Sequence, residues 1–299
     1  MKVSASFLLI ASWLGAVVQA FTSPTQASIR QSQYNNNNNN RNSNVILFMG
    51  WGPDPIWSSA TLVSNEPACA SGKSALLQVQ VPAETSAEFT TPGQYVQVRL
   101  DDGMEQPLFL AMASAPNADS DILEFLVKKT DNNDWLTEMN DSENLQISQV
   151  LGGGFAMEEN LEGFKYDFPT QNLYLFAAGS GLAPIKSAVE SGKLNVQPVA
   201  GGRSCRLYYG ERTAEDLCCV DRFAEWEAAG IQVVPVLSQP NDETWEGRSG
   251  YLQNALEEDG IAIPRNSGAL LCGMKGMTEA VKNLLTQAGV FEGRVLFNF

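Results

Sequence analysis

The chain has 299 residues, with 19 Lys and Arg against 34 Asp and Glu, a formal charge of −15 and no His. The absence of His excludes Ser-His-Asp triads, Cys-His dyads and every His-ligated metal or haem site. So acidic a chain is also atypical of proteins that hold nucleic acid or anionic membranes through Lys and Arg. With 44% apolar residues the chain can bury a large core, and its length predicts about two domains.

Residues 1–20 have the features of a secretory signal peptide. Lys2 makes the start positive, residues 7–18 form a mostly apolar run too short to span a bilayer, and residues 18–20 make a small-residue cleavage site. Residues 21–53 contain no acid and are rich in Ser, Thr, Gln and Asn, which is the composition of a transit peptide. The pair resembles the bipartite presequence of diatoms and related algae, which implies a plastid (chloroplast) location. The alternative is a secreted protein with a low-complexity linker.

Removing this presequence makes the rest of the chain more acidic. Residues 1–53 contain three basic side chains and no acid, so the remainder carries a charge near −18.

Period-two patterns dominate residues 54–165. Apolar and polar side chains alternate through residues 77–81, 96–100 and 123–127, and Gly, Pro, Asn and Asp separate these runs. Short strands at this spacing predict an all-β antiparallel barrel.

The pattern changes in residues 166–299. Apolar runs at residues 173–177, 207–209, 233–237, 269–272 and 295–297 alternate with helical patterns at residues 184–190, 216–229, 251–258 and 277–288. Strands that alternate with helices predict βαβ units, and therefore an α/β Rossmann-like domain with a parallel sheet.

The segment Gly179-Ser180-Gly181-Leu182-Ala183-Pro184 follows a predicted strand and opens a predicted helix. Glycines allow a ligand to approach the backbone closely, and unpaired N–H groups at a helix N-terminus bind phosphate. Because Pro stands at the last position, the segment differs from the usual dinucleotide fingerprint. By itself it indicates a tight strand-to-helix turn that is suited to binding a phosphate.

Two further segments follow predicted strands in the same way, residues 207–212 (Leu-Tyr-Tyr-Gly-Glu-Arg) and 271–277 (Leu-Cys-Gly-Met-Lys-Gly-Met). In order, spacing and position, the three segments resemble the nucleotide-site motifs of the ferredoxin-NADP reductase superfamily. The resemblance covers about residues 58–299 and favours the plastid-associated plant fruit-protein-like branch. It implies a six-stranded Greek-key-type barrel that binds flavin, followed by an NAD(P)-binding domain. The implied activity is hydride transfer between NAD(P)H and a bound flavin, with electrons passed on to an unknown acceptor.

The resemblance also implies site residues. For NAD(P)H these are Gly179, Ser180, Gly181, Pro184, Tyr209, Gly210, Arg212, Gly273 and Met277, with Cys272 as the catalytic residue that faces the nicotinamide. For flavin they are Phe109, Leu110, Ala111, Ser114, Gly153 and Gly154. Cys272 is also interpretable as a small buried apolar residue at a strand end.

The flavin segment departs from the family pattern. Members that hold flavin tightly carry Arg-x-Tyr-Ser where this chain has Leu108-Phe109-Leu110-Ala111, and Asp134 stands where a diphosphate would bind. Lys128 and Lys129 either supply a replacement charge or form a solvated strand end. The resemblance implies FAD, and these departures leave FMN or no flavin as the alternatives. The alternative function is a catalytically weak or inactive family member that binds nucleotide and acts as a redox-sensing or assembly partner.

The remaining predictions concern metals and partners. The five Cys residues lack CxxC spacing, so no metal site is expected, and Cys218 and Cys219 are placed in a helix. No nucleic acid and no membrane span are expected. Ferredoxins are acidic and dock on basic surfaces, so this acidic chain is not expected to use one as its acceptor. Preference between NADH and NADPH stays open.

Overall fold

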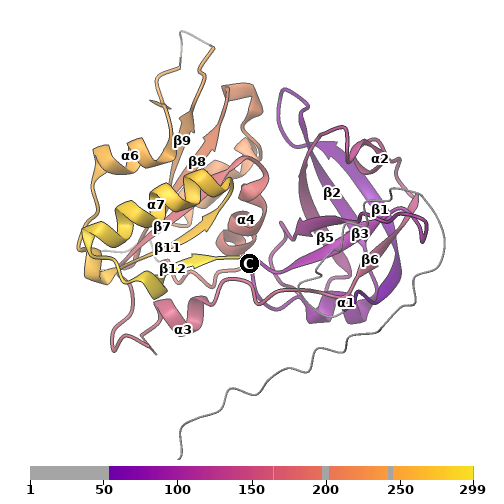
Figure 1. The fold of residues 1–299 in the computed structure, drawn as a ribbon, viewed down its shortest axis with the longest axis horizontal. Helices are drawn as coiled ribbons and strands as arrows, with labels where there is room; N and C mark the ends of the chain where they lie inside the picture. The colour runs from indigo at the N-terminus through magenta and orange to yellow at the C-terminus, as the bar shows by residue number, and fades with distance from the viewer. Residues whose placement is uncertain (1–53, 164, 197–201, 242–244, 299) are drawn as a thin grey trace, which may run out of the picture. The chain divides into compact units, whose positions relative to one another are not determined.

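The computed structural model describes residues 54–163, 165–196, 202–241 and 245–298 (Figure 1), all within the compact unit of residues 50–299. The predicted signal peptide and transit segment lie outside the described residues. Within the described part of the chain, no helix has both the length and the apolar character needed to cross a membrane.

The first six strands form an antiparallel sheet that nearly closes into a barrel, as predicted. They are β1 (Trp57–Pro67), β2 (Ser74–Gln80), β3 (Tyr95–Arg99), β4 (Leu108–Ala111), β5 (Ile122–Lys128) and β6 (Asn144–Ser148), in the order β4-β3-β6-β1-β2-β5. Three short helices, α1 (Ala83–Glu88), α2 (Asp134–Thr137) and α3 (Met157–Leu161), occur in the same part of the chain. Leu77, Val79 and Phe125 are buried in the barrel core, as the alternation predicts, whereas Leu100, just beyond the end of β3, is 43% exposed.

The barrel is open along one seam. Its two edge strands, β4 and β5, meet just beyond the end of β4, where Met112 bridges Phe125 and the Ala113 N–H donates to Glu124 O over 2.7 Å. Along Leu108–Ala111 the hydrogen-bonded partner of β4 is β3, and no ladder to β5 occurs in the described residues. The outer edge of β4 therefore presents backbone donors and acceptors that the sheet leaves unpaired.

The second six strands form the predicted parallel sheet. They are β7 (Asn172–Ala178), β8 (Ser204–Glu211), β9 (Ile231–Leu237), β10 (Arg248–Ser249), β11 (Ser267–Cys272) and β12 (Val295–Phe297), in the order β10-β9-β8-β7-β11-β12. Chain progression reverses between β7 and β11. The carboxyl ends of these two strands are the place where open α/β sheets bind ligands.

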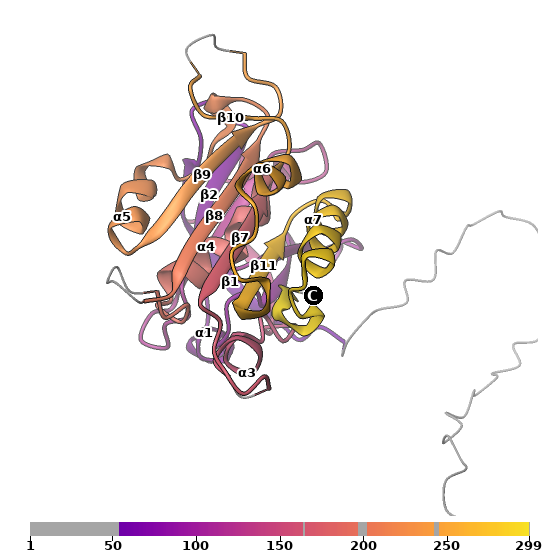
Figure 2. The same cartoon turned by 90° about the vertical axis from the view of Figure 1, so that its left-hand side faces the viewer.

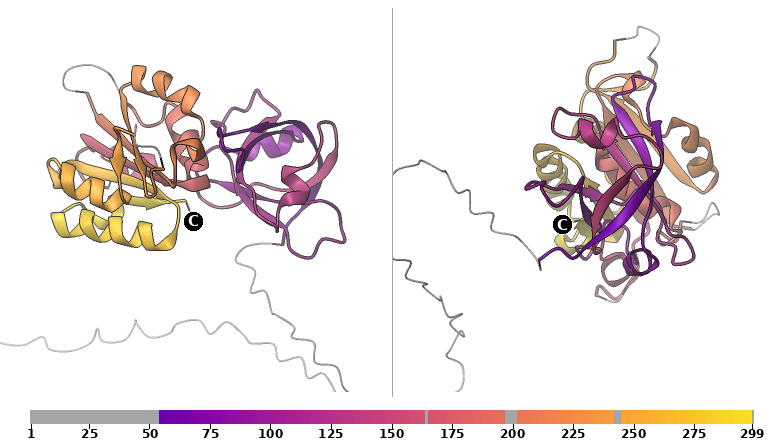
Figure 3. Two further views of the ribbon diagram at one scale, coloured as in Figure 1. Left: turned by 90° about the horizontal axis from the view of Figure 1, so that it is seen from above. Right: turned by 90° about the vertical axis from the view of Figure 1, so that its right-hand side faces the viewer.

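Helices cover both faces of this sheet. They are α4 (Leu182–Glu190), α5 (Phe223–Ala228), α6 (Leu252–Asp259) and α7 (Lys275–Ala288). Ile185 of α4 and Trp226 of α5 pack with Leu175, whereas α6 and α7 pack on the opposite face with Phe176. Figures 2 and 3 show α5 and α7 on opposite sides of the strands. Successive side chains of β7 point to the two faces, so both are apolar, as expected for a parallel sheet buried on both sides.

The prediction of one helix over residues 216–229 is wrong at its start. Regular α-helix covers only Phe223–Ala228, because Cys219 adopts a left-handed φ of 56° and Cys218 forms an antiparallel bridge with Cys69. The placement of Cys218 and Cys219 in a helix is therefore also wrong. A pairing with residues far away in the sequence overrides the local helical pattern here.

Candidate functional site

A groove of about 1100 Å³ lies at the carboxyl ends of β7, β8, β9 and β11 and extends to β4 and β5 of the barrel. Residues after three parallel strands line it together with residues from the open seam of the barrel. The sequence-predicted residues in its lining are Phe109, Leu110, Ala111, Gly179, Ser180, Gly181, Pro184, Gly210, Arg212, Cys272, Gly273 and Met277. The fold therefore brings the three predicted segments and β4 to one place.

The loop between β7 and α4 forms the centre of the groove. Gly179 adopts a left-handed φ of 59°, and residues 179–181 make a 3-10 turn that leads directly into α4. A Cβ on Gly181 would collide with the backbone carbonyl of Cys272, so only glycine permits this approach of the loop to β11. No side chain caps α4, and its first residues line the groove, so this helix N-terminus is a place that suits an anion.

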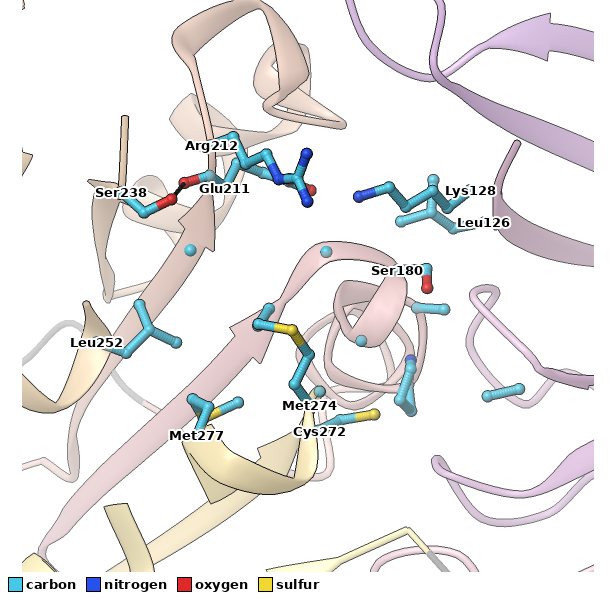
Figure 4. Close-up of a pocket in the computed structure, with 18 of the residues that line it drawn as sticks. Leu126, Lys128, Ser180, Glu211, Arg212, Ser238, Leu252, Cys272, Met274 and Met277 are labelled. Carbon is cyan, nitrogen blue, oxygen red and sulfur yellow. Dashed lines mark hydrogen bonds between the residues drawn. The ribbon is translucent and has the colours of Figure 1, made fainter. Parts of the chain in front are cut away.

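The end of β8 adds an acidic residue, Glu211, and a basic residue, Arg212, to the groove lining. Ser238 N donates to Glu211 O over 3.0 Å, and Gln239 N donates to Arg212 O over 2.9 Å, so the segment that follows β9 holds the backbone of both residues in place. Figure 4 shows the Arg212 guanidinium pointing across the groove toward Lys128 of β5. Burial raises the pKa of Glu211, although a hydrogen bond from Tyr209 and the charge of Lys128 oppose the rise.

Tyr209 takes a different place from the one implied by the resemblance. Its side chain is fully buried and is absent from the groove lining. Its hydroxyl donates to Glu211 Oε1 over 3.1 Å and accepts the Cys218 N–H over 3.1 Å. Tyr209 therefore positions Glu211 from behind the groove wall.

Cys272 lies at the end of β11 and lines the groove (Figure 4). It is 9% exposed, and burial raises the pKa of its thiol to about 12. The thiol therefore stays protonated at neutral pH and is not a thiolate nucleophile. The next residue, Gly273, has a φ of 151° and packs against Met277, so the turn into α7 is tight.

The barrel side of the groove is apolar. The Phe109 side chain is 61% exposed, and its ring lies 6.0 Å from that of Tyr95. Leu110 and Ala111 continue this wall along the unpaired edge of β4. A flavin ring requires an apolar surface beside backbone donors and acceptors, and the seam provides both. The residues present therefore fit the flavin ring without the Arg and Tyr of the family pattern.

Three residues predicted for flavin lie outside the groove lining. Ser114 Oγ accepts the Glu124 N–H over 3.1 Å, within the junction that closes the barrel. Gly153 lines a second cavity of about 940 Å³ beside Thr91, and Gly154 packs against Pro92 with a left-handed φ of 66°. Ser114, Gly153 and Gly154 therefore contact other parts of the structure and do not line the groove with Phe109.

Lys128 is the charged residue that the sequence left undecided, and it lines the groove. The loop that follows it is held by Asn133, whose Oδ1 accepts the Thr130 N–H and whose Nδ2 donates to Lys128 O, both over 2.8 Å. Asp134 instead accepts the Trp135 N–H over 3.1 Å and is absent from the groove lining. The signal in the sequence that could have placed Lys128 in the groove is its position as the last residue of a predicted strand.

Comparisons with known proteins agree with this geometry. The family model described as "Oxidoreductase NAD-binding domain" matches residues 175–283. The fruit protein pKIWI502 of Actinidia deliciosa is 32% identical over 255 residues, which cover 81% of this chain and 76% of the relative. A CDP-6-deoxy-L-threo-D-glycero-4-hexulose-3-dehydrase reductase of Yersinia pestis is 28% identical over 74% of this chain. The chain spans 62% of the length of that second relative.

Solved structures with the same fold are more distant in sequence. A ferredoxin NADP+ reductase from Neisseria gonorrhoeae with bound FAD and NADP has a TM-score of 0.65 at 17% identity, over 81% of this chain and 97% of the other. The ferredoxin reductase in carbazole 1,9a-dioxygenase has a TM-score of 0.64 at 17% identity, over 82% of this chain and 70% of the other. These likenesses establish the two-sheet fold.

Proposed function

The chain belongs to the ferredoxin-NADP reductase superfamily, and we propose that it is a flavin-dependent oxidoreductase that takes a hydride from NAD(P)H. Members of this superfamily are NAD(P)H-dependent flavin oxidoreductases that bind FAD. The observation that carries the proposal is the single groove from the N-terminus of α4 to the open seam beside β4. It is large enough for two ring systems to meet.

The parallel-sheet side of the groove would hold the nicotinamide nucleotide. The N–H groups at the start of α4 and the left-handed Gly179 provide a place for the diphosphate. The Arg212 guanidinium can add a charge-assisted hydrogen bond to a phosphate. Cys272 and Met277 line the groove near the strand ends, where their apolar surfaces would keep water away from the nicotinamide.

The barrel side would hold the flavin. When bound, a flavin supplies the group that accepts a hydride from a reduced nicotinamide. Phe109, Leu110 and Ala111 would form the apolar wall, and Lys128 would neutralise a phosphate. The chain has no His, and the reaction requires none, because the residues bind, orient and shield the two cofactors.

The direct test is the absorbance spectrum of the purified protein after incubation with FAD or FMN and removal of free flavin. We expect a flavin spectrum at close to one equivalent, and oxidation of NADPH or NADH when an artificial acceptor is added. A protein that retains no flavin and oxidises neither nucleotide would overturn the proposal.

A neighbouring pair of lysines provides a matched control for the flavin side. Lys128 lines the groove, whereas the next residue, Lys129, is exposed and lies outside the lining. Lys128→Gln is expected to weaken FAD binding about tenfold, the effect of losing one charged hydrogen bond. Lys129→Gln should bind FAD as the unmodified protein does. Equal affinities in the two variants would remove Lys128 from the site.

One observation favours the alternative function. β4 carries no Arg, Tyr or Ser at residues 108–111, so the three side chains of the family's flavin motif are all missing. A descendant that binds nucleotide but no flavin would act as a redox-sensing or assembly partner. Calorimetric titration distinguishes the two functions, because nucleotide binding without flavin binding or turnover supports the alternative. A stoichiometric flavin ends it.

We further propose a plastid location and an acceptor other than ferredoxin. The basic, acid-free presequence supports plastid import, and the relative from Actinidia deliciosa is a plant fruit protein. The charge near −18 outside residues 1–53 opposes docking of an acidic protein. Residues 1–53 fused to a fluorescent protein and expressed in a diatom test the proposed location. We expect fluorescence in the plastid, and secretion of the fusion would contradict the proposal.

A further inference from the structure

Two cysteines from opposite halves of the chain face each other. Cys69 lies in the turn between β1 and β2, and Cys218 lies in the non-helical segment after β8. They form an isolated antiparallel bridge, and the Cys219 N–H donates to Ala68 O over 3.1 Å on one side of the pair. Both thiols are free. No other two cysteines in the described residues are bridge partners.

This bridge has the geometry that a disulfide requires. A flanking N–H to C=O bond between residues 219 and 68 is the pattern of a non-hydrogen-bonded antiparallel pair, in which facing Cα atoms lie about 4.5 Å apart. Disulfides join residues whose Cα atoms are about 4.4–6.8 Å apart. The two sulfur atoms can therefore bond with little movement of the backbone.

Contacts on both sides hold the pair in register. The Ser71 N–H donates to Glu215 O over 2.8 Å, and Lys73 Nζ forms an ion pair with Asp216 at 2.9 Å. In addition, the Tyr209 hydroxyl accepts a hydrogen bond from the Cys218 N–H. Because the segments are already docked, closing the disulfide would cost little further conformational entropy.

The two thiols differ in reactivity. Burial acts to raise the pKa of Cys69, but hydrogen bonds from Ser71 and from the backbone of Ser74 and Lys73 bring it below the usual value. Burial raises the pKa of Cys218 to about 12. Cys69 is 8% exposed and Cys218 is 1% exposed. Cys69 is therefore the thiol that a small reagent meets first and the better source of thiolate.

We propose that Cys69 and Cys218 form a reversible disulfide that covalently joins the β1–β2 turn of the barrel to the segment after β8. The oxidant is a disulfide, either small or protein-borne. The Cys69 thiolate attacks one sulfur of that disulfide, which forms a mixed disulfide and releases one thiolate. The Cys218 thiol then loses its proton and attacks the Cys69 sulfur, which forms the Cys69–Cys218 bond and releases the second thiol. Two protein thiols are oxidised, and one external disulfide is reduced to two thiols.

The test uses the full chain with oxidised glutathione as the disulfide. After treatment and removal of reagent, denatured protein should show three reactive thiols in place of five, and peptide mapping should join residues 69 and 218. Thermal unfolding should shift upward by about 10 °C and return after dithiothreitol, since a long loop is cross-linked. Five remaining thiols, or a stable glutathione adduct, would refute the proposal.

Variants separate this pair from the other cysteines. Cys69→Ser and Cys218→Ser should each abolish the cross-link and the thermal shift. Cys219→Ser, Cys205→Ser and Cys272→Ser should leave both intact, because these residues have no facing cysteine among the bridge partners. A cross-link that disappears in Cys219→Ser and persists in Cys218→Ser would show that Cys219 is the partner of Cys69. That result would overturn the proposal. None of these outcomes depends on flavin or NAD(P)H.

Discussion

At the scale of single residues, the absence of a Cβ atom at Gly181 determines how closely the β7–α4 loop approaches the end of β11. Gly181 packs against the Cys272 carbonyl, so a methyl group there must displace the backbone of the β7–α4 loop. Gly181→Ala is expected to lower the free energy of unfolding by about 1–3 kcal/mol, the usual cost of overpacking. It should also weaken NAD(P)H binding at least tenfold. Calorimetry and fluorescence titration measure the two effects.

Gly153→Ala is the matched control for this substitution. A Cβ at Gly153 meets nothing within 4 Å, and the residue lies outside the groove lining. Its stability and nucleotide affinity should be unchanged. If Gly153→Ala were as damaging as Gly181→Ala, the packing explanation would be wrong.

Glu211 predicts a pH dependence of nucleotide binding. Burial raises its pKa, so the carboxyl holds its proton to a higher pH than an exposed Glu does. The ionised form repels a bound diphosphate, so affinity for NAD⁺ should increase as pH falls from neutral toward the Glu211 pKa. NAD⁺ itself does not titrate in this range. Calorimetric titrations at several pH values measure the slope, which should flatten in Glu211→Gln; an unchanged slope in that variant would exclude Glu211 as its source.

At the scale of secondary-structure elements, a buried ion pair network joins α4 to the barrel. Lys186 of α4 is 4% exposed and lies 2.8 Å from Glu124 of β5 and 2.8 Å from Glu190. Burial opposes the charges, but the two carboxylates raise the pKa of Lys186, and Lys186 lowers that of Glu124. The helix that begins at the groove is thereby fixed against the barrel wall.

Lys186→Met should lower the free energy of unfolding by about 3 kcal/mol, because the half-buried Glu124 loses its ion-pair partner, while Glu190 keeps only its pair with Arg222. Because the pKa of Glu124 is lowered in the folded protein, its ion pair stabilises the fold at every pH above the ordinary pKa of a Glu side chain. That contribution is lost as the pH falls through the lowered pKa. The deficit of the variant should therefore shrink in acid. Lys275→Met, which removes an exposed partner of Glu279, should cost less than about 0.5 kcal/mol. Denaturant unfolding measures both, and equal losses would show that burial is not the cause.

At the scale of the whole molecule, net charge should govern the choice of electron acceptor. Outside residues 1–53 the charge is near −18, and long-range fields of this sign attract cations and repel anions. With NADPH and bound flavin, reduction of hexaammineruthenium(III), a cation, should slow as salt is added. Reduction of the anion ferricyanide should speed up. Stopped-flow rates at increasing ionic strength test this, and a ferricyanide rate that falls with salt would indicate a local basic docking site instead.

The architecture could be predicted because it follows from local chemistry. Alternation at Leu77 and Val79 requires a sheet with one buried face, and the glycines before Pro184 require a tight turn into a helix. Residues 216–222 could not be predicted in the same way. Their sequence suits a helix, but Cys218 pairs with Cys69 in a distant turn, and this bridge leaves only short 3-10 turns on either side of it.

The sequence alone determined the two-sheet fold, the acidic surface, the absence of imidazole chemistry and the three loops that meet at the groove. Tertiary structure decided which of the candidate residues reach that groove: Lys128 does, whereas Tyr209, Ser114, Gly153 and Gly154 do not. It also placed Cys69 opposite Cys218. The physical reason is that periodicity and turn chemistry depend on neighbours in the chain. Access to a cavity depends instead on how strands from different sheets pack, and no short segment encodes that packing.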